Sequence, residues 1–366
     1  MSNSELAPVL KQRLDALDIF RGLTLMAMIV VNSPGTYGQL SHAYWEGLTI
    51  ADFIFPFFLF IVGVAIALNL KRLPETAAQR NAFYTKVIKR TAILFALGLV
   101  VNLFYTHFAQ IRVAGVLQRI ALVYCACSIL TLLFNTRQLI WISVLLLMGY
   151  WAMLLFIPAP GIAAGTLERG HNLVNWIDLQ FLPGMLWRGT WDPEGIISTL
   201  PSIVTGLVGV FVGKIVLRNE SLPERISAIF VLGLCVFLLG YLWSFFFPFI
   251  KQIWTSSFAL ATAGAGTLLL ALLLWTIDYK GIQRFTFVAR VFGTNAIFAY
   301  VFHVILEKLL TYKVDGISSV HSVFITTLEG AGLATDAASF LWISLFLALC
   351  FAPIYVMYKR GIFLKI

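Results

Sequence analysis

Apolar residues occur along this chain in long blocks and do not alternate with polar residues. Ten blocks are long enough to cross a hydrocarbon core of about 30 Å, which takes roughly 20 helical residues. They cover residues 17–33, 49–70, 87–106, 111–134, 138–157, 195–216, 226–247, 252–276, 286–310 and 337–358. Strands of an outer-membrane barrel would alternate instead. The pattern predicts an all-α polytopic membrane protein with one transmembrane domain over residues 1–366.

The composition agrees with a lipid environment. The chain has 366 residues, of which 60% are hydrophobic and 12% are charged, whereas soluble globular proteins carry about 25% charged residues. The first 16 residues are polar, and no short apolar core with a cleavage site follows them. We therefore expect the first span to act as its own insertion signal. The cysteines lack disulfide or metal-ligand spacing, and no metal site is predicted. They are Cys125, Cys127, Cys235 and Cys350.

Lysine and arginine residues are unevenly divided between the two sets of connections. Such residues concentrate in cytoplasmic loops. If the N-terminus is cytoplasmic, the cytoplasmic side carries Lys11, Arg13, Lys71, Arg72, Arg80, Lys86, Lys89, Arg90, Arg137, Lys214, Arg218, Arg225, Lys280, Arg284, Arg290, Lys359, Arg360 and Lys365. The opposite side carries Arg112, Arg169, Arg188, Lys251, Lys308 and Lys313. We expect both termini in the cytoplasm. The net charge of +9 follows from this topology, so no nucleic acid partner is predicted.

This orientation places two polar connections outside the cytoplasm. One runs from Asn32 to Thr49, and the other covers residues 158–194. The second is 37 residues long and combines Gly, Pro and three tryptophans with Asp178, Asp192 and Glu194. Long structured loops in compact folds are usually functional. No internal sequence repeat is apparent, which argues against an inverted-repeat transporter.

A histidine and a carboxylate lie close together in the first of these regions. His42 stands in the connection after Asn32, and Asp52 lies just inside the second predicted span. A histidine can take a proton from an incoming nucleophile near neutral pH, and a nearby carboxylate can fix its tautomer. An ordinary loop histidine is the alternative interpretation of His42.

Two arginines lie within predicted spans. Arg119 follows Gln118 in GVLQRIALVY, eight residues into the fourth span. An arginine at this depth needs a carboxylate, a phosphate or a water-filled cavity, so a binding site and a structural ion pair both remain open. Arg21 is three residues from Asp18 in LDIFRG, on one helical face, which favours a pair between them.

Further polar candidates lie at the end of the long loop and in the ninth span. Trp191, Asp192 and Glu194 belong to WDPEG, where the loop enters the sixth span. Helix capping would explain Asp192, whereas Glu194 suits an ammonium group, and Trp191 suits either a sugar face or a membrane interface. His303 shares a helical face with Glu307, which fits a functional site or a bond to a neighbouring helix.

In their order along the chain, these motifs resemble the heparan-α-glucosaminide N-acetyltransferase family and its bacterial inner-membrane relatives. The matching segments extend from about Arg13 to His303. They are RLDALDIFRGLTLMAMIVVN, HAYWEGLTIADFIFPFFLFIVG, RVAGVLQRIALVY, the run from GHNLVNWID to GTWDPEGIISTLPSIVTGLVG, and FGTNAIFAYVFH. The resemblance implies a transmembrane enzyme that transfers acetyl from cytosolic acetyl-CoA to glucosamine-type amino sugars on the far side. It also implies a bacterial inner-membrane location.

The resemblance further implies residue roles. His42 corresponds to the catalytic histidine, and Asn32 is expected to assist it. We add Asp52 to the catalytic set because of its position near His42. The expected substrate-binding residues are Asp192, Glu194, Trp191 and His303. Arg119 is expected by the same resemblance to bind acetyl-CoA, and we predict Gln118, Arg21 and Asn295 as further acetyl-CoA-binding residues. The loop after Asn32 reads SPGTYG where the lysosomal enzyme is richer in glycine. For this reason, and because we expect no lumenal domain before the first span, we expect a free amino sugar or short oligosaccharide as acceptor.

CoA is too charged to cross hydrocarbon, so we expect its phosphates on the cytoplasmic side and its pantetheine arm between helices, pointing to His42. The sugar amine is expected to enter beneath the long loop. Direct transfer in a ternary complex is favoured over an acetyl-histidine intermediate, although both use the same imidazole. A sugar O-acyltransferase of the same fold and an amino-sugar transporter remain alternatives. A homo-oligomer is compatible with the sequence.

Overall fold

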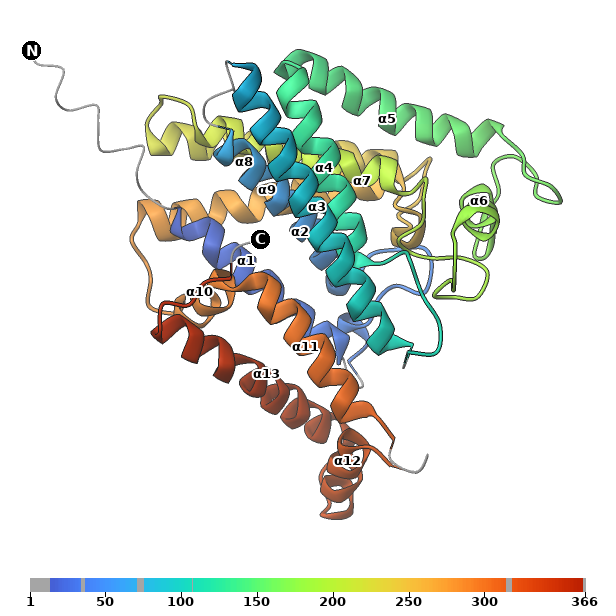
Figure 1. Ribbon diagram of the computed structural model, residues 1–366, viewed down its shortest axis with the longest axis vertical. Coiled ribbons are helices and arrows are strands. Elements are labelled where there is room, and N and C mark those ends of the chain that lie inside the picture. Colours follow the sequence, from blue (N-terminus) through green and yellow to red (C-terminus); the bar gives the residue numbers. More distant parts are fainter. Residues whose placement is uncertain (1–13, 34–36, 71–75, 107, 314–317, 365–366) are drawn as a thin grey trace, which may run out of the picture.

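The computed structural model describes residues 14–33, 37–70, 76–106, 108–313 and 318–364. Helices dominate this part of the chain (Figure 1). They are α1 (Asp15–Asn32), α2 (Ile50–Asn69), α3 (Ala77–Tyr105), α4 (Val116–Leu133), α5 (Thr136–Phe156), α6 (Leu173–Phe181), α7 (Thr199–Val216), α8 (Leu222–Trp243), α9 (Ser256–Leu273), α10 (Phe287–Thr294), α11 (Ala296–Thr311), α12 (Val320–Gly330) and α13 (Thr335–Lys359). Short helical turns are η2 (Gly38–Leu40), η3 (Lys251–Ile253) and η4 (Leu274–Tyr279), and β1 (Leu167–Glu168) pairs antiparallel with β2 (His171–Asn172).

Most of the predicted spans are confirmed. Among the described residues, eight helices are long and apolar enough to cross a membrane: α2, α3, α4, α5, α7, α8, α9 with its extension η4, and α13. The first predicted span forms α1, but its 18 residues include Asp15, Asp18 and Arg21, so its composition alone does not qualify it. The chain is an all-α, multi-pass membrane protein.

The predicted span over residues 286–310 is apolar enough to cross a membrane, but it is broken into two helices. This segment forms α10 and α11, whose axes differ by 91° where they meet at Asn295. The Asn295 side chain donates to the carbonyl oxygen of Ile362 and accepts from the amide of Leu364. Its polar atoms therefore tie the break to the segment after α13. An apolar pattern cannot reveal such a bend, because the two arms follow each other in one continuous apolar block.

Close packing of backbones holds the middle of the bundle together. Figure 1 shows α2, α4, α7 and α9 near the middle, with α5 and α13 at opposite edges. A Cβ atom at Gly63 of α2 would lie 1.9 Å from the carbonyl oxygen of Gly206 in α7, and one at Gly209 would lie 2.1 Å from that of Phe60. Small residues permit such approach between membrane helices. The predicted packing role of Gly209 and Gly213 is confirmed, since Gly213 likewise lies against α2.

The bundle has a central layer and a lipid-facing layer. The buried share of each span is 67–78% for α2, α7 and α9 but 22–28% for α3, α5, α8 and α13. The outer helices expose many large apolar side chains. In water this surface would be strongly unfavourable, so it requires a hydrocarbon solvent.

The connections that were predicted to lie outside the cytoplasm meet at one end of the bundle. The amide of Gly47, after α1, donates to the carbonyl oxygen of Phe249, after α8, at 2.9 Å. Arg112, after α3, pairs through its backbone with Gly184, in the connection after α5. We call this end, where the connections after α1, α3, α5 and α8 meet, the loop end.

The shared location of these connections fits the predicted topology, while the membrane side that the loop end faces stays a prediction. Several residues used for that prediction lie outside the described part of the chain. They are Lys11, Arg13, Lys71, Arg72 and Lys365. Pro34, Gly35 and Thr36 of SPGTYG, which entered the prediction of the acceptor, also lie outside the described part.

Replacing Gly209 by leucine tests the close approach of α2 and α7. The added side chain must displace the Phe60 backbone, and overpacking of this kind costs about 1–3 kcal/mol or more. Gly149→Leu is the control, because no atom lies within 4 Å of a Cβ built there. We expect thermal unfolding in detergent, followed by tryptophan fluorescence, to occur at a clearly lower temperature for G209L alone. Equal unfolding temperatures for the two variants would contradict the packing.

Candidate functional site

Asp52 positions His42 at the loop end. His42 Nδ1 lies 3.0 Å from Asp52 Oδ1. The other carboxylate oxygen accepts hydrogen bonds from the amides of Ala43 and Thr49. Asp52 thus caps the start of α2 and also fixes the imidazole. The predicted proximity of His42 and Asp52 is confirmed.

The environment of this pair suits a proton acceptor. The His42 side chain is 45% exposed, while that of Asp52 is fully buried. When Nδ1–H is donated to Asp52, Nε2 presents a lone pair. An accessible imidazole held in one tautomer can take a proton from an approaching amine.

Lys251 completes this centre and was missed as a site residue by the sequence analysis. It begins η3 between α8 and α9, and its Nζ lies 2.8 Å from His42 Nδ1 and 3.2 Å from Nε2. It also lies 3.4 Å from Asp52 Oδ1. Burial lowers the pKa of Lys251, although Asp52 and Glu194 oppose this shift. In the sequence, Lys251 was distinguished only as one of the six lysines and arginines assigned to the non-cytoplasmic side.

A second ionic cluster ties the long loop to the connection after α3. Arg112 Nε and Nη2 donate to the two Asp192 oxygens at 2.7 and 2.6 Å, and Nη2 also lies 2.6 Å from Glu194 Oε2. Asp192 accepts further bonds from the amides of Trp187 and Glu194. Burial alone would raise the pKa of Asp192, but the Arg112 guanidinium holds it below its usual value. Such a bidentate, fully hydrogen-bonded pair is a strong tether.

The capping interpretation of Asp192 is wrong. The helix predicted to start near residue 195 starts at Thr199, so Asp192 lies seven residues before it. Pairing with Arg112 explains the carboxylate instead. Arg112 had entered the sequence analysis through the topology and as the first residue of RVAGVLQRIALVY, but not as a site residue, because 80 residues separate it from Asp192 and nothing local links them.

Aromatic side chains surround the Arg112 cluster. The guanidinium lies 5.0 Å from the Trp187 ring, which in turn meets Tyr105 edge to face. Trp191 is buried and packs edge to face on Trp45 at 5.4 Å. Its predicted contact with a sugar therefore stays a prediction. Tyr44 is 78% exposed, and the Arg169 guanidinium lies 4.0 Å from the centre of its ring.

Arg119 is a buried cation whose hydrogen bonds are incomplete. Its Nη2 donates to the carbonyl oxygen of Gly195 and to Ser198 Oγ, and its guanidinium lies 5.2 Å from the Trp254 ring. Its Nε and Nη1 have no hydrogen-bond partner among the described residues, and neither does the Gln118 amide. A direct ion pair between Arg119 and a carboxylate is also absent from that part of the chain. Buried polar groups without partners commonly mark a place for water or ligand atoms.

Asp178 lies beside this arginine and had not been predicted as a site residue. It belongs to α6 and is fully buried, and burial raises its pKa to about 7 against the opposing effects of the Ile196 amide and Arg119. One carboxylate oxygen accepts from that amide, while the other lacks a partner among the described residues. A Cβ at Gly195 would lie 1.9 Å from Asp178, so only glycine fits there.

Asn32 contacts His303. Its Nδ2 lies 3.0 Å from His303 Nε2, which joins the end of α1 to the middle of α11. His303 is fully buried, and its Nδ1 lies 3.3 Å from the carbonyl oxygen of Ala299. The structure thus brings together Asn32, which was predicted as a catalytic residue, and His303, which was predicted to bind the substrate. Glu307, one turn further, has a buried carboxylate oxygen without a hydrogen-bond partner among the described residues.

The remaining predicted cofactor residues lie at the other end of the bundle. Arg21 pairs with Asp18 at 3.0 Å, as expected, and contacts the carbonyl oxygen of Gly293 at 3.4 Å. Asn295 binds the segment after α13. Their roles in binding acetyl-CoA stay predictions. No three His, Cys, Asp or Glu side chains of the described part lie together as a metal site would require.

Comparison with known proteins places the chain in a family. The family model described as heparan-alpha-glucosaminide N-acetyltransferase, catalytic, matches residues 13–243, which is more than half of the 366 residues. The chain belongs to the heparan-α-glucosaminide N-acetyltransferase family. The matched region includes His42, Asp52, Arg112 and Arg119 but ends before Lys251.

Two relatives carry the name heparan-alpha-glucosaminide N-acetyltransferase. The human protein is 28% identical, over 83% of this chain and 54% of its own length. The mouse protein is 27% identical, over 97% of this chain and 60% of its own length. The chain therefore spans somewhat more than half of the length of these members of the heparan-α-glucosaminide N-acetyltransferase family.

Replacing Arg112 by methionine tests whether it tethers the loop. The change leaves the carboxylates of Asp192 and Glu194 without their cation, and breaking a buried ion pair in this way costs about 3–5 kcal/mol. We expect a lower unfolding temperature in detergent at pH 7. The exposed Arg188→Met change in the same loop is the control.

The pH dependence of this effect has a defined sign. Without Arg112, burial raises the pKa of Asp192, so protonation at falling pH removes the unpaired charge. The stability difference between R112M and the unmodified protein should therefore narrow as the pH falls from 7 to 5. A difference that is constant or grows over this range would refute the tether.

Proposed function

We propose that this protein transfers the acetyl group of acetyl-CoA to the amine of glucosamine or a short glucosamine-terminated oligosaccharide. The observation that carries the proposal is the accessible His42 imidazole on the buried carboxylate of Asp52. It stands in a chain whose relatives are named for N-acetyl transfer to a glucosaminide. We further propose a bacterial inner membrane location with both termini in the cytoplasm, supported by the distribution of lysine and arginine.

The reaction follows from the orientation of the ring. His42 Nε2 removes a proton from the amine as its nitrogen attacks the thioester carbonyl carbon. The carbon–sulfur bond then breaks, and the imidazolium returns the proton to the departing thiolate of CoA. Asp52 holds the tautomer and balances the charge of the imidazolium, as buried carboxylates beside catalytic histidines do.

Lys251 has a separate role in this proposal. Its ammonium group is the cation nearest to His42 among the described residues. A fixed cation beside the reacting carbonyl stabilises the negative charge that develops on the thioester oxygen. Lys251 also forms an ion pair with Asp52, so its charge helps to keep His42 and Asp52 in position.

Acetyl-CoA is proposed to enter from the cytoplasmic side and to extend its pantetheine arm through the bundle. The unpartnered atoms of Arg119 and Gln118 support this path, because they are buried donors and acceptors of the kind that amide groups satisfy. Gly98 and Gly115 leave the space that the Gln118 amide occupies. The amine is proposed to approach from the loop end, where Glu194 is an acid suited to an ammonium group.

The direct test is release of CoA thiol by purified protein with acetyl-CoA and glucosamine. Loss of a general base typically lowers the rate by 10²- to 10⁴-fold, and we expect a decrease in that range for His42→Ala. His171→Ala is the control, since His171 is an exposed histidine of the long loop. Glucose in place of glucosamine separates N-transfer from O-transfer.

Two outcomes would contradict this proposal. Equal rates for H42A and H171A would remove His42 from the reaction. Thiol release with glucose as fast as with glucosamine would point to O-acetyl transfer. Stoichiometric acetyl label on His42 without sugar would replace the ternary complex by an acetyl-histidine route, in which His42 acts as the nucleophile and not as the base.

Lys251→Met tests the role of the cation through the pH profile. Because burial lowers the pKa of Lys251, the ammonium form is present below this lowered value and is lost as the pH rises through it. The unmodified protein should lose kcat on the alkaline side at a pH below that of ordinary lysine. K251M should show kcat lowered by about 10²-fold or more and no such alkaline limb.

The exposed Lys313→Met variant is the control for this profile, and it should keep both the rate and the limb. Lys251→Arg retains a cation, so it should recover part of the rate and shift the limb upward. An alkaline limb that persists unchanged in K251M would show that another group titrates there.

A further inference from the structure

An apolar groove runs between α5 and α8 on the lipid-facing side of the bundle. Both helices pack against α7 and α9, which form the floor. The groove has a volume of about 760 Å³. Val144 and Met148 of α5 line one wall, Val236 and Leu239 of α8 line the other, and Val208 of α7 lies at the bottom. Its shape and lining suit a hydrocarbon chain.

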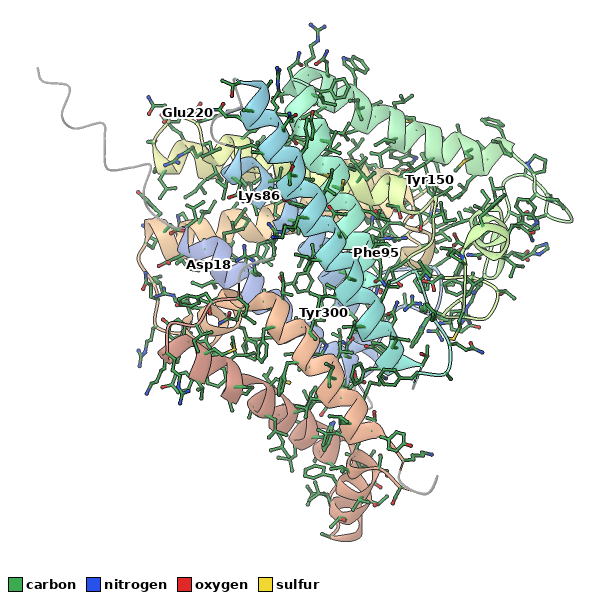
Figure 2. All side chains as sticks on the ribbon, viewed as in Figure 1. Asp18, Lys86, Phe95, Tyr150, Glu220 and Tyr300 are labelled. Carbon is green, nitrogen blue, oxygen red and sulfur yellow. The ribbon has the colours of Figure 1, made fainter. Side chains whose placement is uncertain are left out.

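The two ends of the groove differ in chemistry. Figure 2 marks them by Glu220, in the connection between α7 and α8, and by Tyr150, on the side of the long loop. At the first end the lining includes Lys214 and Arg218. At the second end it includes Trp151 and Trp243, whose rings meet edge to face at 5.6 Å. Tryptophans gather at membrane interfaces, so the groove extends from one interface toward the other.

The cations at the first end are available to an anion. Among the described residues, Lys214 Nζ forms a hydrogen bond with a neutral group, the hydroxyl of Thr136, at 3.0 Å. Arg218 lies 3.8 Å from Glu220, and both side chains are about half exposed. Because Lys214 and Arg218 face one solvent-exposed acid, Glu220, these three side chains have a net positive charge. A phosphate fits between them because it accepts hydrogen bonds from lysine, arginine and threonine together.

We propose that this groove binds an anionic phospholipid. One acyl chain lies along the groove, and the phosphate rests on Lys214 and Arg218. Basic pockets between transmembrane helices commonly hold anionic headgroups in this way. The site is distinct from the centre around His42, which lies at the opposite end of the bundle.

A second copy of the chain fits the groove less well. A symmetric dimer in a membrane has its two-fold axis along the membrane normal, so each residue faces its counterpart at the same depth. Contact through this groove would then bring the two Lys214 and Arg218 pairs together. The repulsion between these cations favours a lipid as occupant.

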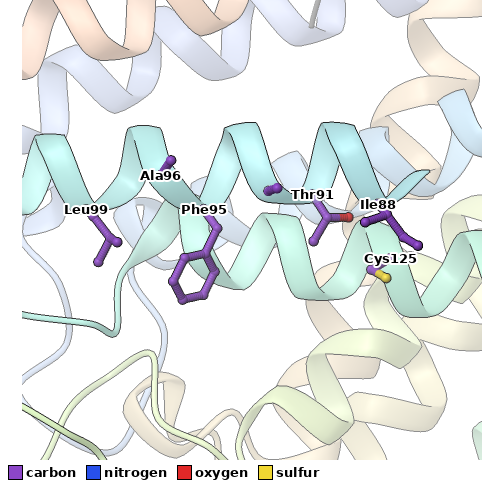
Figure 3. Close-up of a pocket in the computed structure, with 7 residues that line it drawn as sticks. Ile88, Thr91, Phe95, Ala96, Leu99 and Cys125 are labelled. Carbon is purple, nitrogen blue, oxygen red and sulfur yellow. The ribbon is translucent and has the colours of Figure 1, made fainter. Parts of the chain in front are cut away.

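A second hollow in the outer surface provides a contrast. It lies between α3 and α4, has a volume of about 420 Å³ and is shown in Figure 3. Ile88, Phe95 and Leu99 line it together with Cys125, and no charged residue belongs to its lining. It offers nothing that would select one lipid headgroup over another, so we attach no ligand to it.

The test is native mass spectrometry of the full chain after exposure to equal amounts of dioleoyl phosphatidylglycerol and dioleoyl phosphatidylcholine, which have the same acyl chains. We expect the unmodified protein to retain phosphatidylglycerol about 10-fold better, because two cations contribute near the headgroup. Lys214→Gln with Arg218→Gln should abolish this preference. Arg137→Gln, a nearby cation outside the groove lining, should preserve it.

Leu239→Trp provides a second variant that keeps both cations. The indole fills the groove from its rim, so we expect retention of both lipids to fall while the preference for phosphatidylglycerol in the residual binding persists. Three results would overturn the proposal: equal retention of the two lipids by the unmodified protein, an unchanged preference in the double glutamine variant, or a lipid-free dimer that L239W dissociates.

Discussion

The carboxylate of Asp52 is the interaction on which the loop end depends. A buried carboxylate is unfavourable unless hydrogen bonds and a cation compensate for lost hydration. Asp52 obtains this compensation from the amide of Thr49, the imidazole of His42 and the ammonium of Lys251. These partners come from the start of α2, the connection after α1 and the connection after α8. The contacts that compensate the Asp52 charge therefore fix three segments, and they also orient the His42 imidazole.

Glycine packing makes this convergence possible. Because Gly63 and Gly209 allow the α2 and α7 backbones to touch, α2 occupies the middle of the bundle and carries Asp52 there. The connections of the surrounding helices then meet over its N-terminus. The long loop folds across this point and is held by the two bonds from Arg112 to Asp192. Helix packing in the membrane and ionic contacts at its surface thus act on the same few segments.

The sequence predicted those features that local physics determines. Hydropathy alone located eight spans, since twenty consecutive apolar residues have few alternatives, and the pairing of His42 with Asp52 followed from a short separation along the chain. Lys251 and Arg112 were not recognised as site residues, because they lie 209 and 80 residues from His42 and Asp192. Only the fold brings them there. The bend at Asn295 was also missed, because the amide that stabilises it bonds the distant segment after α13.

The two buried arginines differ in a way that separates structure from function. Arg112 is matched by two carboxylates and an aromatic ring, and nothing about it calls for a ligand. Arg119 is more deeply buried, yet two of its nitrogens lack partners among the described residues, as does the neighbouring Gln118 amide. Uncompensated burial of this extent is costly and is uncommon where a residue serves stability alone. An incoming molecule with amide groups would complete these hydrogen bonds, so part of its binding energy would come from groups that folding leaves unsatisfied.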